Sequence, residues 1–123
     1  MRKILVIDDD EQIRKLLYRV MEQAGFEVQV AADGRKGLSL FEESFYDLVI
    51  TDLIMPEQEG IETITFLRKN YPQVKIIAIS GGGRIGPETY LPLALELGAN
   101  LAFAKPFSID QITNAVKELL DVT

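Results

Sequence analysis

The chain of 123 residues contains neither cysteine nor histidine. Without cysteine it can form no disulfide and offers no thiol nucleophile, and zinc sites of the cysteine/histidine kind are excluded. The lack of histidine also excludes a serine–histidine–aspartate triad. A reducing cytosol is compatible with this composition, and the cytoplasm is the expected location.

An excess of basic residues and long apolar runs are also missing. Lysine and arginine number 13 against 19 aspartates and glutamates, and the net charge of −6 argues against direct nucleic-acid binding. No apolar run approaches the roughly 18 residues of a membrane span, and the opening residues lead straight into a predicted strand, so we expect no signal peptide. With 47% hydrophobic residues, the chain is expected to form one globular domain over residues 1–123.

Four short apolar runs each end in residues that can bind a cation or a phosphoryl group. Ile4–Ile7 runs into Asp8–Asp10, Leu48–Thr51 into Asp52, Ile76–Ile79 into Ser80, and Leu101–Ala104 into Lys105. Buried parallel strands read as continuous apolar runs, and ligands of open α/β sheets bind beyond the carboxyl ends of the strands. One sheet edge is therefore predicted to gather carboxylates, a hydroxyl and an ammonium.

Helical patterns alternate with these runs. Apolar residues at three- and four-residue steps predict helices around the following segments: Ile13–Ala24, Leu38–Phe41, Ile61–Leu67, Leu91–Leu97 and Ile109–Leu120. Phe26–Ala31 alternates like an edge strand. Five strands alternating with five helices predict an α/β fold, a single doubly wound parallel sheet in the flavodoxin-like order 2-1-3-4-5 with helices on both faces.

Boundary residues fit this alternation. Asp10 and Ser108 are natural N-caps, and Gly25 is a plausible helix stop. Asp33-Gly34 is expected to turn the chain between the second strand and its helix. Proline cannot continue a helix, so Tyr71-Pro72 is expected to end one.

The strand order makes the first and third strands neighbours, so Asp8, Asp9 and Asp52 should converge. Carboxylates are the usual protein ligands of Mg²⁺. Two carboxylates about 5 Å apart repel by roughly 3 kcal/mol at an effective dielectric near 20, so such a cluster favours a functional site. Asp52 could also be a nucleophile that forms an aspartyl phosphate, with Ser80 and Lys105 stabilising the phosphoryl oxygens.

Each of these residues has a plainer interpretation when taken alone. Asp8 or Asp9 could be a helix cap, and Asp52 an ordinary loop acid. Ser80 before three glycines could be turn chemistry, and a single Lys105 is most often a surface residue. Agreement among four strand ends makes coincidence a poor explanation.

A series of motifs runs through the whole chain in one order. They are Lys3–Arg14, Ala32–Gly34, Asp47–Pro56 with Gly60, Ser80, Gly98-Ala99 and Lys105–Phe107. Together they resemble the receiver domain of two-component response regulators. The resemblance implies that a histidine kinase or phosphotransfer protein phosphorylates Asp52 in a Mg²⁺-dependent reaction, after which the domain switches conformation and signals to an output protein.

The resemblance also implies a role for each site residue. Asp9, Asp52 and the backbone carbonyl of Ile54 would be direct Mg²⁺ ligands, and Asp8 would act through water. Ser80 would move to the phosphoryl group and Lys105 would pair with it. The chain would not be an enzyme beyond assisting its own phosphorylation and dephosphorylation, and it would be a monomer or weak dimer that binds neither nucleic acid directly nor membrane.

Two features of the chain, one of them a departure from the family pattern, lead to expectations about signalling. Ala102 stands where the family often has an aromatic switch residue, so the output is expected to run through the Gly81–Gly86 loop and the helix after it. Ile54 and Gly82 cannot orient an attacking water, so the phosphorylated form is expected to be long-lived.

Two alternatives belong to other functional classes. A haloacid-dehalogenase-like phosphatase would explain the Asp-x-Asp pattern of Asp8–Asp10. However, this chain lacks the late acidic pair that would bind the metal of such an enzyme, and this alternative leaves Asp52–Pro56 unexplained. A non-phosphorylated pseudo-receiver would only bind a partner. The complete set of acids, hydroxyl and lysine argues against that alternative.

Overall fold

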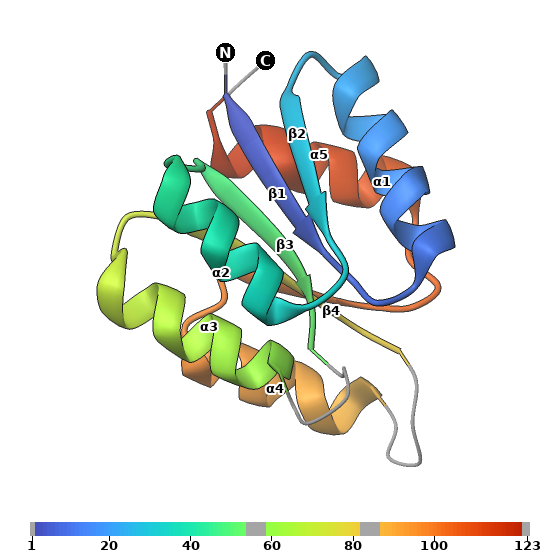
Figure 1. Ribbon diagram of the computed structural model, residues 1–123. Helices are drawn as coiled ribbons and strands as arrows, with labels where there is room; N and C mark the ends of the chain where they lie inside the picture. Colours follow the sequence, from blue (N-terminus) through green and yellow to red (C-terminus); the bar gives the residue numbers. More distant parts are fainter. Residues whose placement is uncertain (1, 54–58, 82–86, 122–123) are drawn as a thin grey trace.

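The computed structural model describes residues 2–53, 59–81 and 87–121 (Figure 1). Its strands are β1 (Lys3–Ile7), β2 (Glu27–Ala31), β3 (Leu48–Asp52), β4 (Lys75–Ser80) and β5 (Leu101–Ala104). Its helices are α1 (Glu11–Gln23), α2 (Gly34–Glu43), α3 (Glu59–Asn70), α4 (Pro87–Leu97) and α5 (Ile109–Leu119). The strands form one parallel sheet in the order β2-β1-β3-β4-β5, which confirms the predicted fold and topology.

Helices cover both faces of the sheet (Figure 1). Side chains of α2, α3 and α4 pack on one face with Leu5 and Ile7 of β1. Side chains of α1 and α5 pack on the other face with Ile4 and Val6. Successive strand residues point to opposite faces, so a strand covered on both sides has to be apolar throughout, as β1 is.

Local sequence signals set most helix boundaries. The Asp10 carboxylate caps α1 and the Ser108 hydroxyl caps α5, as predicted. Gly25, with φ +98°, follows the end of α1, and Gly98, with φ +122°, follows α4. These backbone conformations suit glycine because it has no Cβ. The end of α3 at Asn70, before Tyr71-Pro72, is also as predicted.

The chain bends at Ala32 and Asp33, one residue before the predicted turn at Asp33-Gly34. Asp33 is the N-cap of α2, where its carboxylate accepts a hydrogen bond from the Lys36 backbone N–H at 2.8 Å. Gly34 is the first residue of that helix. The reason is that an aspartate oxygen serves a turn and a helix N-terminus by the same kind of hydrogen bond.

Gly60 lies in the first turn of α3 and packs against the end of β3. A Cβ at Gly60 would lie 2.2 Å from the backbone oxygen of Asp52 and 2.5 Å from that of Leu53. Only glycine permits this approach. The contact brings the start of α3 directly against the strand end that carries Asp52.

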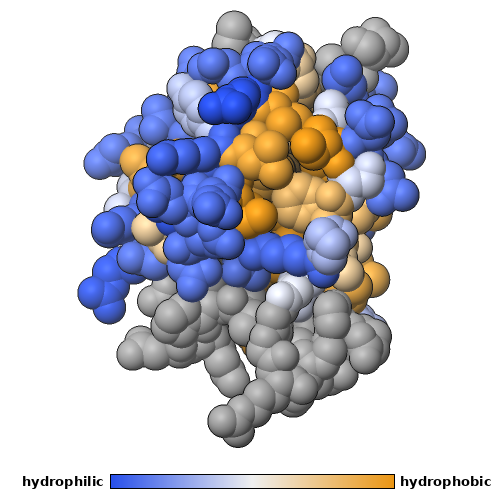
Figure 2. Space-filling view, turned by 90° about the vertical axis from the view of Figure 1, so that its right-hand side faces the viewer, coloured by the Kyte–Doolittle hydropathy of each residue, from blue (hydrophilic) through white to orange (hydrophobic). Residues whose placement is uncertain are grey.

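Figure 2 shows the side of the molecule that carries α1, where an apolar patch is surrounded by hydrophilic residues. Partly buried apolar residues of α1, of α5 and of the segment before α5 pack on the core between these helices and the sheet, among them Ile13, Val20, Phe107 and Leu119.

Among the described residues, none of the helices combines the length and hydropathy of a bilayer-spanning segment.

Candidate functional site

Parallel strand pairing brings the polar strand ends to one edge of the sheet. Asp8 and Asp9 follow β1, Asp52 and Ser80 end β3 and β4, and Lys105 follows β5. The carboxylate oxygens of Asp8, Asp9 and Asp52 offer ligand atoms that all lie within 4.8 Å of one another. The predicted convergence of these three acids is therefore present in the structure.

The loop that carries Asp8 and Asp9 is held by hydrogen bonds on several sides. The Asp8 backbone N–H donates to the Ala31 carbonyl at 3.1 Å, and an Asp8 carboxylate oxygen accepts from the Asp10 N–H at 2.8 Å. Asp10 in turn caps α1 by accepting from the Gln12 N–H at 2.9 Å. The Asp10 carboxylate thus caps the helix, as the sequence predicted, and is not part of the acid cluster.

A single lysine bridges the two buried acids. The Lys105 ammonium nitrogen lies 2.9 Å from a carboxylate oxygen of Asp8 and 3.3 Å from one of Asp52. Asp8 is 1% exposed and Asp52 is 4% exposed, whereas Asp9 is exposed. The Lys105-Pro106 peptide bond that follows is cis.

Burial and neighbouring charges shift the pKa values of Asp8 and Lys105. Burial raises the pKa of Asp8 above its ordinary value of 3.8, although hydrogen bonds from Asp10 and Lys105 oppose the change. Burial alone would lower the pKa of Lys105, but its hydrogen bond to Asp8 and the charge of Asp52 prevail and raise it above 10.5. One ammonium is therefore firmly charged among acids that it cannot fully neutralise.

Ser80 supplies a hydroxyl that still has bonding capacity. In the part of the chain that the structure describes, the Ser80 Oγ atom is buried and has no hydrogen-bond partner. The Ser80 carbonyl accepts from the Lys105 N–H at 2.8 Å, so the two residues are adjacent. Buried hydroxyls are normally paired, and an unpaired one beside a lysine and a carboxylate fits a site for an anionic group.

The acid cluster fits a hard divalent cation. Mg²⁺ is usually held by one or two carboxylates together with water and phosphate oxygens, and Asp8, Asp9 and Asp52 provide carboxylate oxygens on one side of the site. Ile54, the predicted source of a carbonyl ligand, lies outside the described residues, as does Gly82.

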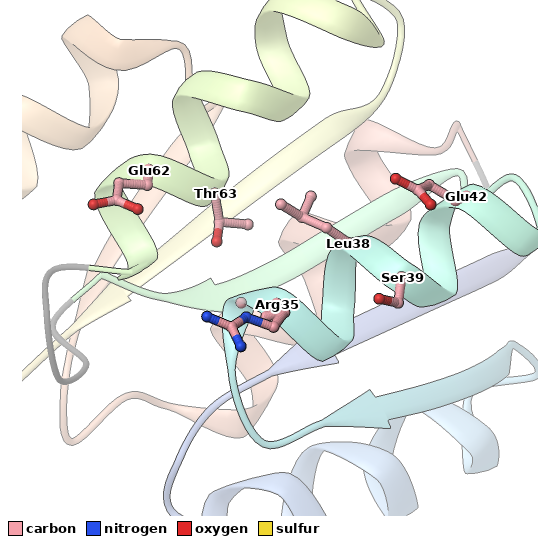
Figure 3. Close-up of a pocket in the computed structure, with 7 residues that line it drawn as sticks. Arg35, Leu38, Ser39, Glu42, Glu62 and Thr63 are labelled. Atoms are coloured by element: carbon pink, nitrogen blue, oxygen red, sulfur yellow. The ribbon is translucent and has the colours of Figure 1, made fainter.

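A separate cavity of about 380 Å³ opens between α2 and α3. Figure 3 shows Arg35 and Ser39 on α2 across from Glu62 and Thr63 on α3. None of the described residues of the acid site lines this cavity. It mixes both signs of charge and offers no cluster of ligands, so it is not the candidate site.

Arg14 has a role that sequence reasoning missed. Its guanidinium Nη1 donates to the Asp8 backbone carbonyl at 2.8 Å. The sequence placed Arg14 in a motif without giving it a function, because an acceptor on the backbone leaves no trace in residue types.

The face assignment of the fifth strand agrees with the alternation rule. Ala102 packs with the α2, α3 and α4 side of the core, and Phe103 packs with the α1 and α5 side. The strand therefore presents no aromatic ring on the Ala102 face. Residues 82–86 of the predicted output loop, Gly81–Gly86, lie outside the described residues, and that output route stays a prediction.

Comparisons with known proteins agree with this geometry. A family model for the response regulator receiver domain matches residues 4–117. The transcriptional regulatory protein CpxR of Escherichia coli (strain K12) is 37% identical over 120 residues, covering 98% of this chain and 50% of CpxR. SrrA of Staphylococcus aureus (strain NCTC 8325 / PS 47) is 36% identical over 118 residues, covering 96% of this chain and 47% of SrrA.

Solved structures give the same result. A receiver domain protein from Clostridium thermocellum superposes with a TM-score of 0.88 at 30% identity, covering 98% of this chain and 95% of that one. TrrA from Thermotoga maritima, solved in complex with Mg²⁺ and BeF, gives a TM-score of 0.84 at 33% identity, covering 97% of this chain and 99% of TrrA. The chain spans about half the length of the curated relatives it matches. The chain belongs to the family of response regulator receiver domains.

Proposed function

We propose that this receiver domain accepts a phosphoryl group on Asp52 from the phosphohistidine of a partner kinase or phosphotransfer protein. The observation that carries the proposal is the position of the Asp52 carboxylate, which is buried at the strand end, bonded to Lys105 and adjacent to two further acids. A buried acid without a functional role would not be expected beside two further acids, because like charges placed close together cost free energy.

The transfer requires little from the protein besides placement and charge. A carboxylate oxygen of Asp52 bonds to phosphorus while the bond from phosphorus to the histidine nitrogen breaks, and that nitrogen keeps the electron pair. Lys105 remains beside the new phosphoryl group and balances part of its charge. The Ser80 hydroxyl, buried without a partner among the described residues, can donate to a phosphoryl oxygen.

Asp8, Asp9 and Asp52 would hold Mg²⁺, with the Ile54 carbonyl as a further ligand. When bound, the ion supplies positive charge that offsets the charge of the phosphoryl oxygens. The excess of carboxylates over ammonium groups at this edge supports the assignment. On this proposal the chain assists its own phosphorylation and dephosphorylation and turns over no other substrate.

The output partner is proposed from the relatives. CpxR and SrrA are named transcriptional regulatory proteins, and this chain spans about half of each. We propose that the signal passes from a cytoplasmic receiver to a separate domain or protein that acts on DNA. The net charge of −6 supports a receiver that does not itself bind nucleic acid.

Mass spectrometry after incubation with acetyl phosphate and Mg²⁺ tests the assignment of Asp52. We expect one added phosphoryl group in the parent and none in Asp52→Asn. Asp10→Asn is the matched control, because it removes a neighbouring carboxylate while asparagine caps a helix as well as aspartate. Full phosphorylation of Asp52→Asn, or its loss in Asp10→Asn alone, would contradict the assignment.

A further inference from the structure

The Asp8–Asp9 peptide is held by an arginine that the proposed reaction does not use. Arg14 lies half-buried in the first turns of α1, and its Nη1 atom donates to the Asp8 carbonyl at 2.8 Å. The backbone N–H of the same Asp8 donates to the Ala31 carbonyl at 3.1 Å. Both backbone groups of Asp8 are thus fixed, one by the neighbouring strand and one by the helix that follows.

This arrangement determines where Asp9 points. The peptide group is planar, so fixing the Asp8 carbonyl oxygen also fixes the orientation of the Asp9 N–H and the position of the Asp9 Cα atom, from which the side chain extends. In the described part of the chain, no hydrogen bond holds the Asp9 carboxylate itself. Its position beside Asp8 and Asp52 therefore depends on the backbone.

Arg14 is itself anchored by the helix it belongs to. Its backbone N–H donates to the Asp10 carbonyl at 3.0 Å, and Asp10 caps the same helix. The guanidinium therefore reaches back from a rigid first turn to the loop that carries the acids. Helix α1 and the acid loop form one hydrogen-bonded unit.

We infer that Arg14 is a positioning residue for the Mg²⁺ site, acting through the Asp8 carbonyl to aim the Asp9 carboxylate at the metal position. The inference rests on the proposed function, since it presumes that Asp8, Asp9 and Asp52 hold the ion. Groups that orient metal ligands typically change metal affinity by about 10-fold or more when removed.

The sign of the effect separates positioning from simple charge. Arg14 is a cation, so replacing it with a neutral residue should tighten Mg²⁺ binding if only electrostatics mattered. If Arg14 positions Asp9, the same replacement should weaken binding. Arg19, exposed on the same helix, is the matched control, because Arg19→Gln removes the same charge from the surface.

Mg²⁺ titration followed by amide chemical shifts gives the dissociation constant without any phosphorylation. We expect Arg14→Gln to weaken Mg²⁺ binding by about 10-fold, Arg14→Lys to weaken it less, and Arg19→Gln to leave it unchanged or slightly tighter. Melting in EDTA shows whether each variant is folded at the titration temperature. If Arg14→Gln does not fold, weakened binding by Arg14→Lys decides the question.

The possible failures can be told apart. A parent protein that binds no Mg²⁺ would overturn the proposed metal site and this inference together. A parent that binds Mg²⁺ would overturn the role of Arg14 alone if Arg14→Gln binds at least as tightly, or if Arg14→Lys does so where Arg14→Gln does not fold. Faster hydrogen exchange at the Asp9 and Asp10 amides in Arg14→Gln would further support positioning, since Arg19→Gln should not change it.

Discussion

At the scale of single residues, the site is defined by more carboxylates than one lysine can balance. Asp8 and Asp52 share Lys105, and Asp9 lies beside them with its own charge. Carboxylates at these separations repel, and burial keeps water from screening them fully. Without a bound metal ion, repulsion among these carboxylates should therefore lower the free energy of unfolding.

Asp52→Asn should raise the stability of the metal-free protein. The substitution removes one carboxylate and leaves Lys105 paired with Asp8, so we expect a gain of about 1 kcal/mol, below the roughly 3 kcal/mol of one full repulsion. Thermal melts in EDTA measure it, with about 4 °C expected for a domain of this size. Asp33→Asn is the control, because it retains a helix cap away from the site. A melting temperature below the parent's would contradict the repulsion argument.

Lys105→Met should destabilise the protein at neutral pH. Removing one partner of a buried ion pair typically costs about 3–5 kcal/mol, because the other charges stay buried without compensation. Denaturant unfolding with and without the substitution measures this cost. A change below about 1 kcal/mol would mean that the carboxylates find another partner or take up protons.

The loss of folding stability at alkaline pH should also depend on Lys105. Its pKa is raised above 10.5 in the folded protein, so its contribution is fully present below pH 10.5 and is lost as the pH rises through the folded pKa. Tyr46, whose pKa burial raises above 10.0, adds a loss of the same sign. Lys105→Arg should reduce the alkaline loss, since arginine stays charged there. An unchanged pH profile would refute this role of Lys105.

At the scale of helices and strands, one arginine ties together the edge opposite the acid site. Arg68 of α3 donates to the Gly98 carbonyl from Nε at 3.0 Å and from Nη2 at 2.8 Å. Its Nη1 donates to the carbonyls of Pro72 at 2.7 Å and Val74 at 2.9 Å. The end of α3, the start of β4 and the end of α4 are thus joined by one side chain.

Arg68→Met should destabilise the fold by about 3 kcal/mol, since several carbonyls lose a charged donor at once. Lys69→Met, an exposed neighbour on the same helix, should change stability by less than about 0.5 kcal/mol. Chemical denaturation measures both. Phosphorylation of Asp52 in the folded fraction should be unaffected, because the Arg68 hydrogen bonds lie at the amino ends of the strands, away from the acid site. A phosphorylation defect in folded Arg68→Met would show coupling between the two edges.

At the scale of the whole molecule, Mg²⁺ should stabilise the native state. The three acids converge only when β1 and β3 are paired, so the unfolded chain has no comparable site. At a Mg²⁺ concentration 100 times the dissociation constant, we expect about 2.7 kcal/mol of added stability. Melting curves with rising Mg²⁺ measure it, and Asp9→Asn should lose most of the shift. Equal shifts in the parent and Asp9→Asn would place the ion elsewhere.

The sequence by itself determined the elements of the fold and the identity of the acids, the hydroxyl and the lysine. Apolar runs identified the strands, and helical periodicity identified the helices. The polar residues after the strands identified the candidate site, because parallel strands end at a common edge of the sheet. Asp33 shows the limit of such signals, because one aspartate serves equally as a turn residue or as a helix cap.

Only the tertiary structure decided how these residues are held. Arg14 binds a carbonyl six residues away and Arg68 binds one thirty residues away, and neither acceptor has a side-chain signature. Gly60 is required by a strand end that passes at 2.2 Å from its missing Cβ. Every residue type carries a backbone carbonyl, and a glycine in the sequence does not show which part of the backbone lies against it. Which of these contacts matter is therefore fixed by the three-dimensional path of the chain and cannot be read from its composition or periodicity.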